Sequence, residues 1–133
     1  MATELLEDPA KAEALRQEMA AMSGSQRAAV LMLLLGEQQA AEIVKFLDPK
    51  EVQALGGAMV SVADLSQEAV NQVLDDFVMT IKKQTSIGLG TTDYVEKVFK
   101  RALGDDKVAL VRIIVADDAA RVAAVLKNMI KAG

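Results

Sequence analysis

One uninterrupted apolar stretch constrains the fold of this chain more than any other feature. Eight apolar residues, Ala28 to Leu35, run directly into Gly36. In an α-helix they complete slightly more than two turns, so their side chains point in every direction around the axis. A surface helix buries only one stripe, and a membrane span needs about 20 apolar residues. We therefore expect residues 26–35 to form a helix that other helices enclose on all sides.

The composition restricts the classes of function that are open to the chain. Its 133 residues correspond to one domain with a full core. It is 52% hydrophobic and only 3% aromatic, which favours small, closely packed helices. It has no His and no Cys, so the commonest general base, metal ligand and thiol nucleophile are missing. We therefore predict no catalytic site, no metal site and no cofactor.

The charge pattern argues against nucleic acid and against a secretory signal. The formal net charge is −4, and basic residues occur only as isolated pairs such as Lys82-Lys83 and Lys100-Arg101. A nucleic-acid-binding protein usually concentrates basic residues on one face. Residues 1–22 are acidic and Ala-rich, unlike a basic and then apolar leader. We expect no nucleic-acid partner and no direct membrane insertion. The absence of Cys fits a reducing compartment such as the cytoplasm.

The capping residues and the Gly and Pro breaks along the chain are typical of helices. No segment shows the alternation of apolar and polar residues that is typical of a strand. The sharpest local signal is Asp48-Pro49-Lys50-Glu51, a variant of the capping box. Gly56-Gly57 lies inside the helix that follows. Because each Gly costs about 1 kcal/mol there relative to Ala, we expect another helix to approach it closely. The predicted helices cover about residues 9–21, 26–35, 37–47, 49–60, 67–86, 93–103, 105–115 and 118–131.

Three motifs in order suggest a family. Ser25–Leu31 is followed by Leu34-Leu35-Gly36, then by Leu47–Val52, and then by Asp93-Tyr94-Val95 with Arg101–Gly104. At this spacing, residues 23–107 resemble the N-terminal domain of FliG, the bacterial flagellar motor switch protein family. The resemblance implies an all-α, armadillo-like fold of about eight short helices arranged as hairpins, without enzymatic activity.

The same resemblance implies partners and a location. The family's N-terminal domain holds FliG to the cytoplasmic C-terminal helices of FliF, the membrane-embedded MS-ring protein. It implies neighbouring FliG subunits in a ring, and a place in the C-ring at the cytoplasmic face of the inner membrane. The family's middle domain, with its Glu-His-Pro-Gln motif, and its torque-bearing domain do not follow here. We therefore expect the chain to correspond to the anchoring part alone.

The last segment, residues 108–133, differs from the family pattern. Val111-Arg112 and then Ala116–Ile130 are similar to the C-terminal segment of FliF itself, which has two short helices around an acidic turn. We favour a chain that combines a FliG-like anchoring domain with a FliF-like tail, as in a fusion. The alternative is the start of the FliG middle domain, which opens in a similar way. The chain then divides into a marginal N-terminal helix at 1–22, an anchoring domain at 23–107 and a tail at 108–133.

A surplus of apolar helix surface predicts a groove that buries partner helices, in cis or in trans. The other interpretation is a self-contained helical scaffold in which the tail belongs to the core and no partner groove exists. The residues expected to form the groove walls are Leu31, Leu34, Leu35, Val73, Phe77 and Ile81. The residues expected to fill the groove from the tail are Val122, Val125, Leu126, Met129 and Ile130.

Overall fold

A computed structural model describes residues 8–84, 101 and 107–132. Over these residues the chain is all-α, as predicted, and contains no strand. The helix expected at residues 93–103 falls almost wholly outside the described residues, as does the Asp93-Tyr94-Val95 motif. The described helices are α2 (Pro9–Ala21), α3 (Gly24–Leu35), α4 (Glu37–Val44), α5 (Pro49–Ser61), α6 (Gln67–Gln84), α8 (Lys107–Asp117) and α9 (Ala119–Ala132).

Local capping determines where the central helices begin. The Asp48 side chain accepts from the Glu51 backbone N–H, and the Glu51 side chain accepts from the Asp48 N–H, both over 2.9 Å. This reciprocal pair is the predicted capping box at the start of α5. Ser23 and Gln26 form a second capping box at the start of α3. Because Ser23 is the N-cap, α3 begins at Gly24, two residues earlier than expected.

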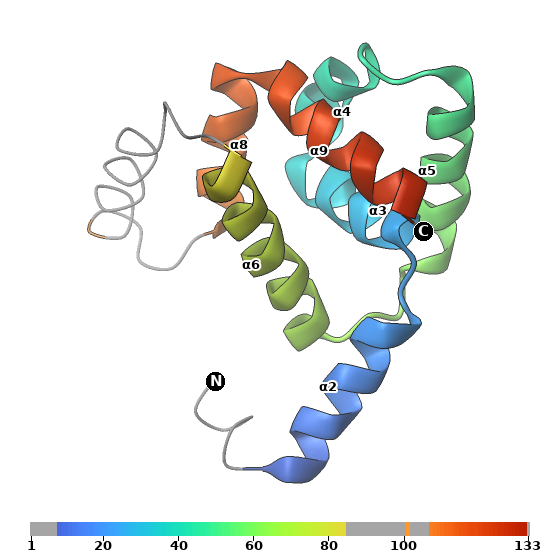
Figure 1. Ribbon diagram of the computed structural model, residues 1–133, viewed down its shortest axis with the longest axis vertical. Coiled ribbons are helices and arrows are strands. Elements are labelled where there is room, and N and C mark those ends of the chain that lie inside the picture. The colour runs from blue at the N-terminus through green and yellow to red at the C-terminus, as the bar shows by residue number, and fades with distance from the viewer. Residues whose placement is uncertain (1–7, 85–100, 102–106, 133) are drawn as a thin grey trace.

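Helix α3 lies at the centre of the body (Figure 1). It contacts α4, α5, α6, α8 and α9, and α9 crosses it from the far end of the chain. Helix α2 projects from this body, and its principal neighbour is α6. The core is one cluster to which every described helix contributes. The last two helices are therefore part of the body and do not extend into solvent.

The expectation that the apolar stretch is enclosed on all sides is wrong at one position. Ala28, Ala29, Val30, Leu31, Met32 and Leu35 are buried, but the Leu33 side chain is 55% exposed. Ala29 and Val30, one turn earlier on the same side of α3, are buried, so the helix is uncovered only near its C-terminal end, at Leu33. Leu34 is half-buried.

The expected close approach at Gly56-Gly57 is also wrong. Both glycines lie inside α5 and are exposed. A Cβ atom added to either would meet nothing within 4 Å. Helix α5 contacts α3 and α9 through its other face, where Leu55 and Ala58 are buried.

Within the described part of the chain, no helix combines the length and the apolar character that crossing a bilayer requires.

Candidate functional site

The predicted groove walls come together on α3 and α6. Leu31 and Leu35 of α3 are buried, as are Val73, Phe77 and Ile81 of α6. The sixth predicted wall residue, Leu34, is half-buried and packs against the same cluster. Residues at i, i+4 and i+8 lie on one face of a helix, so α6 presents a continuous apolar stripe to the body. We call the surface formed by these six residues the groove.

The predicted tail residues fill the groove from the same chain. Helices α8 and α9, which we call the hairpin, pack against each other and against α3, α4 and α6. On α9, Val122, Val125 and Leu126 are buried, and Leu126 is fully inaccessible. Met129 and Ile130 are half-buried at the end of the same stripe. The structure therefore brings all eleven predicted residues into or against one core.

The eleven predicted groove and tail residues include none of the buried residues on α8 and α4. Leu110, Val111 and Val115 of α8 are buried, and so is Ile43 of α4. The helical spacing of the α8 residues was visible in the sequence. From that spacing we expect Val111, Ile114 and Val115 to need a covering surface, and the structure buries Val111 and Val115 and half-buries Ile114.

Two polar contacts fix the hairpin against α3 and α4. Gln39 Nε2 donates to the backbone carbonyl of Arg112 over 2.7 Å. The Arg112 guanidinium donates to the backbone carbonyl of Leu34 over 3.2 Å. Leu34 lies in the last turn of α3, where backbone carbonyls lack partners inside the helix. An ion pair between Lys107 and Asp75 joins α8 to α6.

A further contact joins the hairpin to α5. Lys127 Nζ of α9 lies 3.8 Å from Oε1 of Glu51, whose side chain is 8% exposed. The same oxygen accepts the capping hydrogen bond from the Asp48 N–H. The sequence marked Glu51 only as part of a cap. Its second contact could not be read from the pattern, because it depends on where α9 lies.

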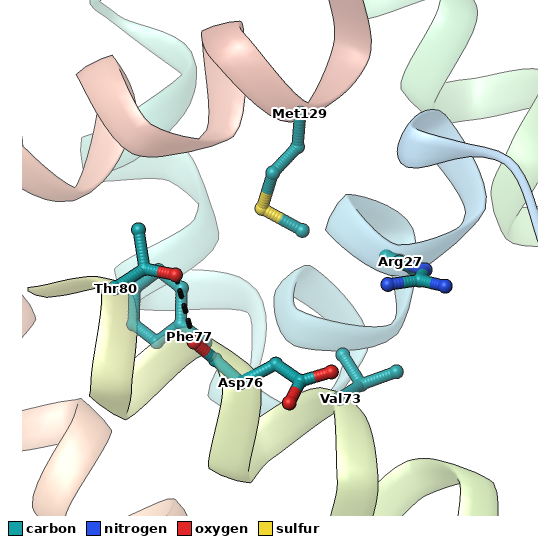
Figure 2. Close-up of a pocket in the computed structure, with 6 residues that line it drawn as sticks. All are labelled: Arg27, Val73, Asp76, Phe77, Thr80 and Met129. Atoms are coloured by element: carbon teal, nitrogen blue, oxygen red, sulfur yellow. Dashed lines mark hydrogen bonds between the residues drawn. The ribbon is translucent and has the colours of Figure 1, made fainter. Parts of the chain in front are cut away.

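A small cavity of about 120 Å³ lies beside the end of α9 (Figure 2). Val73, Phe77 and Thr80 of α6 line one side, and Met129 faces them from α9. Arg27 of α3 and the Asp76 carboxylate also line the cavity. Asp76 accepts from Gln72 Nε2 over 2.9 Å, and Arg27 donates to the Met19 carbonyl over 2.8 Å. Both charged groups therefore already have protein partners.

The arrangement is suited to binding a helix. Over the residues that the structure describes, no three His, Cys, Asp or Glu side chains gather in a way that could hold a metal ion. The apolar groove and its polar margin instead match the apolar and basic faces of an amphipathic hairpin. Helix-in-groove recognition uses the same pattern of apolar anchors at i, i+3 and i+4 spacing.

Comparisons with known proteins agree on one family. The family model of the FliG N-terminal domain matches residues 21–129, which includes α8 and most of α9. The chain is 44% identical over 81 residues to the flagellar motor switch protein FliG of Pseudomonas aeruginosa. It is 41% identical over 90 residues to the protein of the same name from Vibrio cholerae. It is 31% identical over 86 residues to that of Thermotoga maritima. No solved structure matches the chain.

The similarity covers different shares of the two proteins. The aligned regions take up 61%, 68% and 65% of this chain, but only 24%, 26% and 26% of those relatives. The chain thus spans about a quarter of the length of the curated relatives that it matches. The likeness of residues 108–133 to FliF stays a prediction.

Proposed function

The chain belongs to the FliG N-terminal domain family, and from that premise we propose that it anchors the switch complex of the flagellar rotor to the MS-ring. Its relatives are flagellar motor switch proteins, a family of structural and switching components and not of enzymes. In our proposal the groove receives the C-terminal helices of FliF. The groove and the hairpin act as receptor and occupant, and residues 108–133 stand in for the FliF helices.

One observation carries this proposal. The surface formed by the groove residues is covered by the last two helices, and the buried face of α9 includes Val122, Val125 and Leu126, with Met129 and Ile130 beside it. A surface that accommodates this hairpin in cis has the shape and chemistry to accept a similar hairpin in trans. Because the cis hairpin is tethered, its effective concentration at the groove is in the millimolar range. A free partner must therefore displace it.

The location and ring partners follow from the same premise. We infer that the domain lies at the cytoplasmic face of the inner membrane, held there by FliF and without inserting into the bilayer. Neighbouring copies in the C-ring would contact it through surfaces outside the groove. In our proposal these surfaces include the exposed apolar side chains Leu33, Phe46, Val60 and Met79.

A variant with a weakened hairpin tests the proposal. Leu126→Asp places a charge at a fully buried position of α9 but leaves the groove walls intact. A fluorescent peptide that carries the C-terminal segment of FliF from Pseudomonas aeruginosa should bind this variant with micromolar affinity, measured by fluorescence anisotropy. The unaltered chain should bind the peptide at least about tenfold more weakly, because the tethered hairpin competes. A matched second change, Val60→Asp on the exposed side of α5, should leave peptide binding unchanged.

A second candidate function is a self-contained scaffold, and one observation favours it. The hairpin residues are as inaccessible as those of α3, as expected if the hairpin were simply part of the core. This candidate predicts that Leu126→Asp loses its helical circular dichroism signal and binds no peptide. A Leu126→Asp variant that stays folded but does not bind the FliF peptide would also contradict the anchoring proposal.

A further inference from the structure

Glu51 is unusual among the residues that the structure describes, because it is a charged residue in the buried class, at 6% exposure. It occupies the third position of α5, where its Oε1 atom accepts from the Asp48 N–H over 2.9 Å. A buried carboxylate is costly unless an opposite charge compensates it. Lys127 Nζ, 3.8 Å from the same oxygen, supplies that charge from α9.

The capping contact alone does not account for the charge. The other capping box of this chain, at the start of α3, uses the neutral side chain of Gln26 in the same position. Gln26 is only half-buried, and its amide donates to Ser61 Oγ over 3.1 Å. A neutral amide thus completes a capping box in this protein. The negative charge at position 51 therefore serves the contact with α9.

Position 127 is placed at the margin of the buried face of α9. Its predecessor Leu126 is fully inaccessible, whereas the Lys127 side chain is 37% exposed. A long basic side chain at this point can cover apolar surface with its aliphatic stem and extend its charged end toward Glu51. A shorter or neutral side chain would leave the carboxylate facing the hairpin without a counter-charge.

We propose that Glu51 determines which helix the groove accepts, by requiring Lys or Arg in register with Lys127. This inference rests on the proposed function, and it extends it by giving the chemistry of the partner. The partner helix presents a basic residue directly after the deepest apolar anchor, the equivalent of Leu126. A helix with an acidic or neutral residue at that register is disfavoured even when its apolar pattern fits.

A double-mutant cycle in the full chain tests this requirement. Lys127→Met should lower the folding equilibrium constant, measured by urea denaturation, by roughly tenfold, because it leaves a buried carboxylate without its counter-charge. In the Glu51→Gln background, where the cap persists but the charge is gone, Lys127→Met should change the constant by less than about twofold. Lys127→Arg should behave like the unaltered chain. Lys131→Met, at an exposed position one turn further along α9, is the matched control and should have little effect.

Equal effects of Lys127→Met in the two backgrounds would overturn the inference, as would an unchanged folding constant. A peptide-binding experiment tests the same requirement for a partner helix. It uses the Leu126→Asp chain and two FliF peptides that differ only at the position equivalent to Lys127, where one has a basic residue and the other a neutral residue. The peptide with the basic residue should bind roughly tenfold more tightly, and Glu51→Gln should abolish that preference. The cycle involves no partner, so a cycle that succeeds while neither peptide binds refutes only the anchoring proposal. Peptides that bind equally well refute only the charge requirement.

Discussion

Gln39 and Arg112 are joined by a hydrogen bond between segments that lie far apart in the sequence. The Gln39 amide nitrogen donates to the Arg112 carbonyl over 2.7 Å, and the Arg112 guanidinium in turn donates to the carbonyl of Leu34. The amide oxygen of Gln39 is buried and has no hydrogen-bond partner among the residues that the structure describes. The corner between α3 and α4 is thus tied to α8 by hydrogen bonds that use backbone carbonyls as acceptors.

Replacing Gln39 tests the contribution of this tie. Gln39→Ala should lower the free energy of unfolding by about 1 kcal/mol, the usual net value of one hydrogen bond. It should also speed amide hydrogen exchange in α8 more than in α2. The neighbouring exposed residue provides the control, since Gln38→Ala should change neither quantity. Equal effects of the two substitutions would show that the bond contributes nothing to hairpin docking.

Two leucines of opposite exposure test the packing of the hairpin. Leu126→Ala should lower the free energy of unfolding by about 2–5 kcal/mol, because it opens a cavity at a fully buried site. Leu33→Ala should lower it by less than about 0.5 kcal/mol, since that side chain is 55% exposed. Urea denaturation measures both values. Similar losses for the two variants would mean that α9 does not dock as described.

Substitutions of the two α5 glycines should raise the free energy of unfolding, in contrast to the preceding variants. Gly56→Ala and Gly57→Ala should each raise the free energy of unfolding by roughly 0.5–1 kcal/mol, because a helical Ala is preferred and its Cβ meets nothing. Gly36→Ala should lower it instead, by about 1 kcal/mol or more, because Gly36 has φ +88° at the junction of α3 and α4. Thermal melts of the three variants check the signs. Loss of stability at position 56 or 57 would indicate a neighbour that the structure does not show.

The attachment of α2 gives a local prediction. The Glu18 carboxylate accepts from the Ser66 N–H over 2.9 Å and from its hydroxyl over 2.5 Å, at the start of α6. Glu18→Ala should therefore increase hydrogen exchange throughout α2. It should change exchange in α3 little, because α2 meets the body mainly through α6. Lys11→Ala, at an exposed position of α2, is the control. Increased exchange in α3 after Glu18→Ala would contradict this local attachment.

The helices themselves could be predicted because their signals are local. The bounds of α2 coincide with the prediction, since Asp8 caps it and Pro9 takes its first position. The capping box at Asp48 was also readable, because both partners lie within four residues. The packing of the last two helices into the core followed from the amount of apolar surface, which can be counted without knowing the arrangement.

The side that each helix turns toward the core could not be predicted in the same way. Leu33 is as apolar as its neighbours, and only the placement of the surrounding helices leaves it exposed. The Gly56-Gly57 pair suggested a close contact, yet α5 turns its opposite face inward. The contact of Arg112 with the Leu34 carbonyl could not be predicted from residue types, because every residue has a backbone carbonyl. Such contacts between distant segments depend on the tertiary arrangement alone.

The position of α9 across α3 has a consequence for biosynthesis. A ribosome adds roughly eighty residues between the end of α3 and the start of α9, which takes on the order of 4–17 s at bacterial rates. During that interval α3, the most apolar of the described helices, is not yet covered by α9. Transiently exposed apolar surface of this kind makes a nascent chain prone to aggregation. Translation pauses before residue 119 would lengthen this vulnerable period.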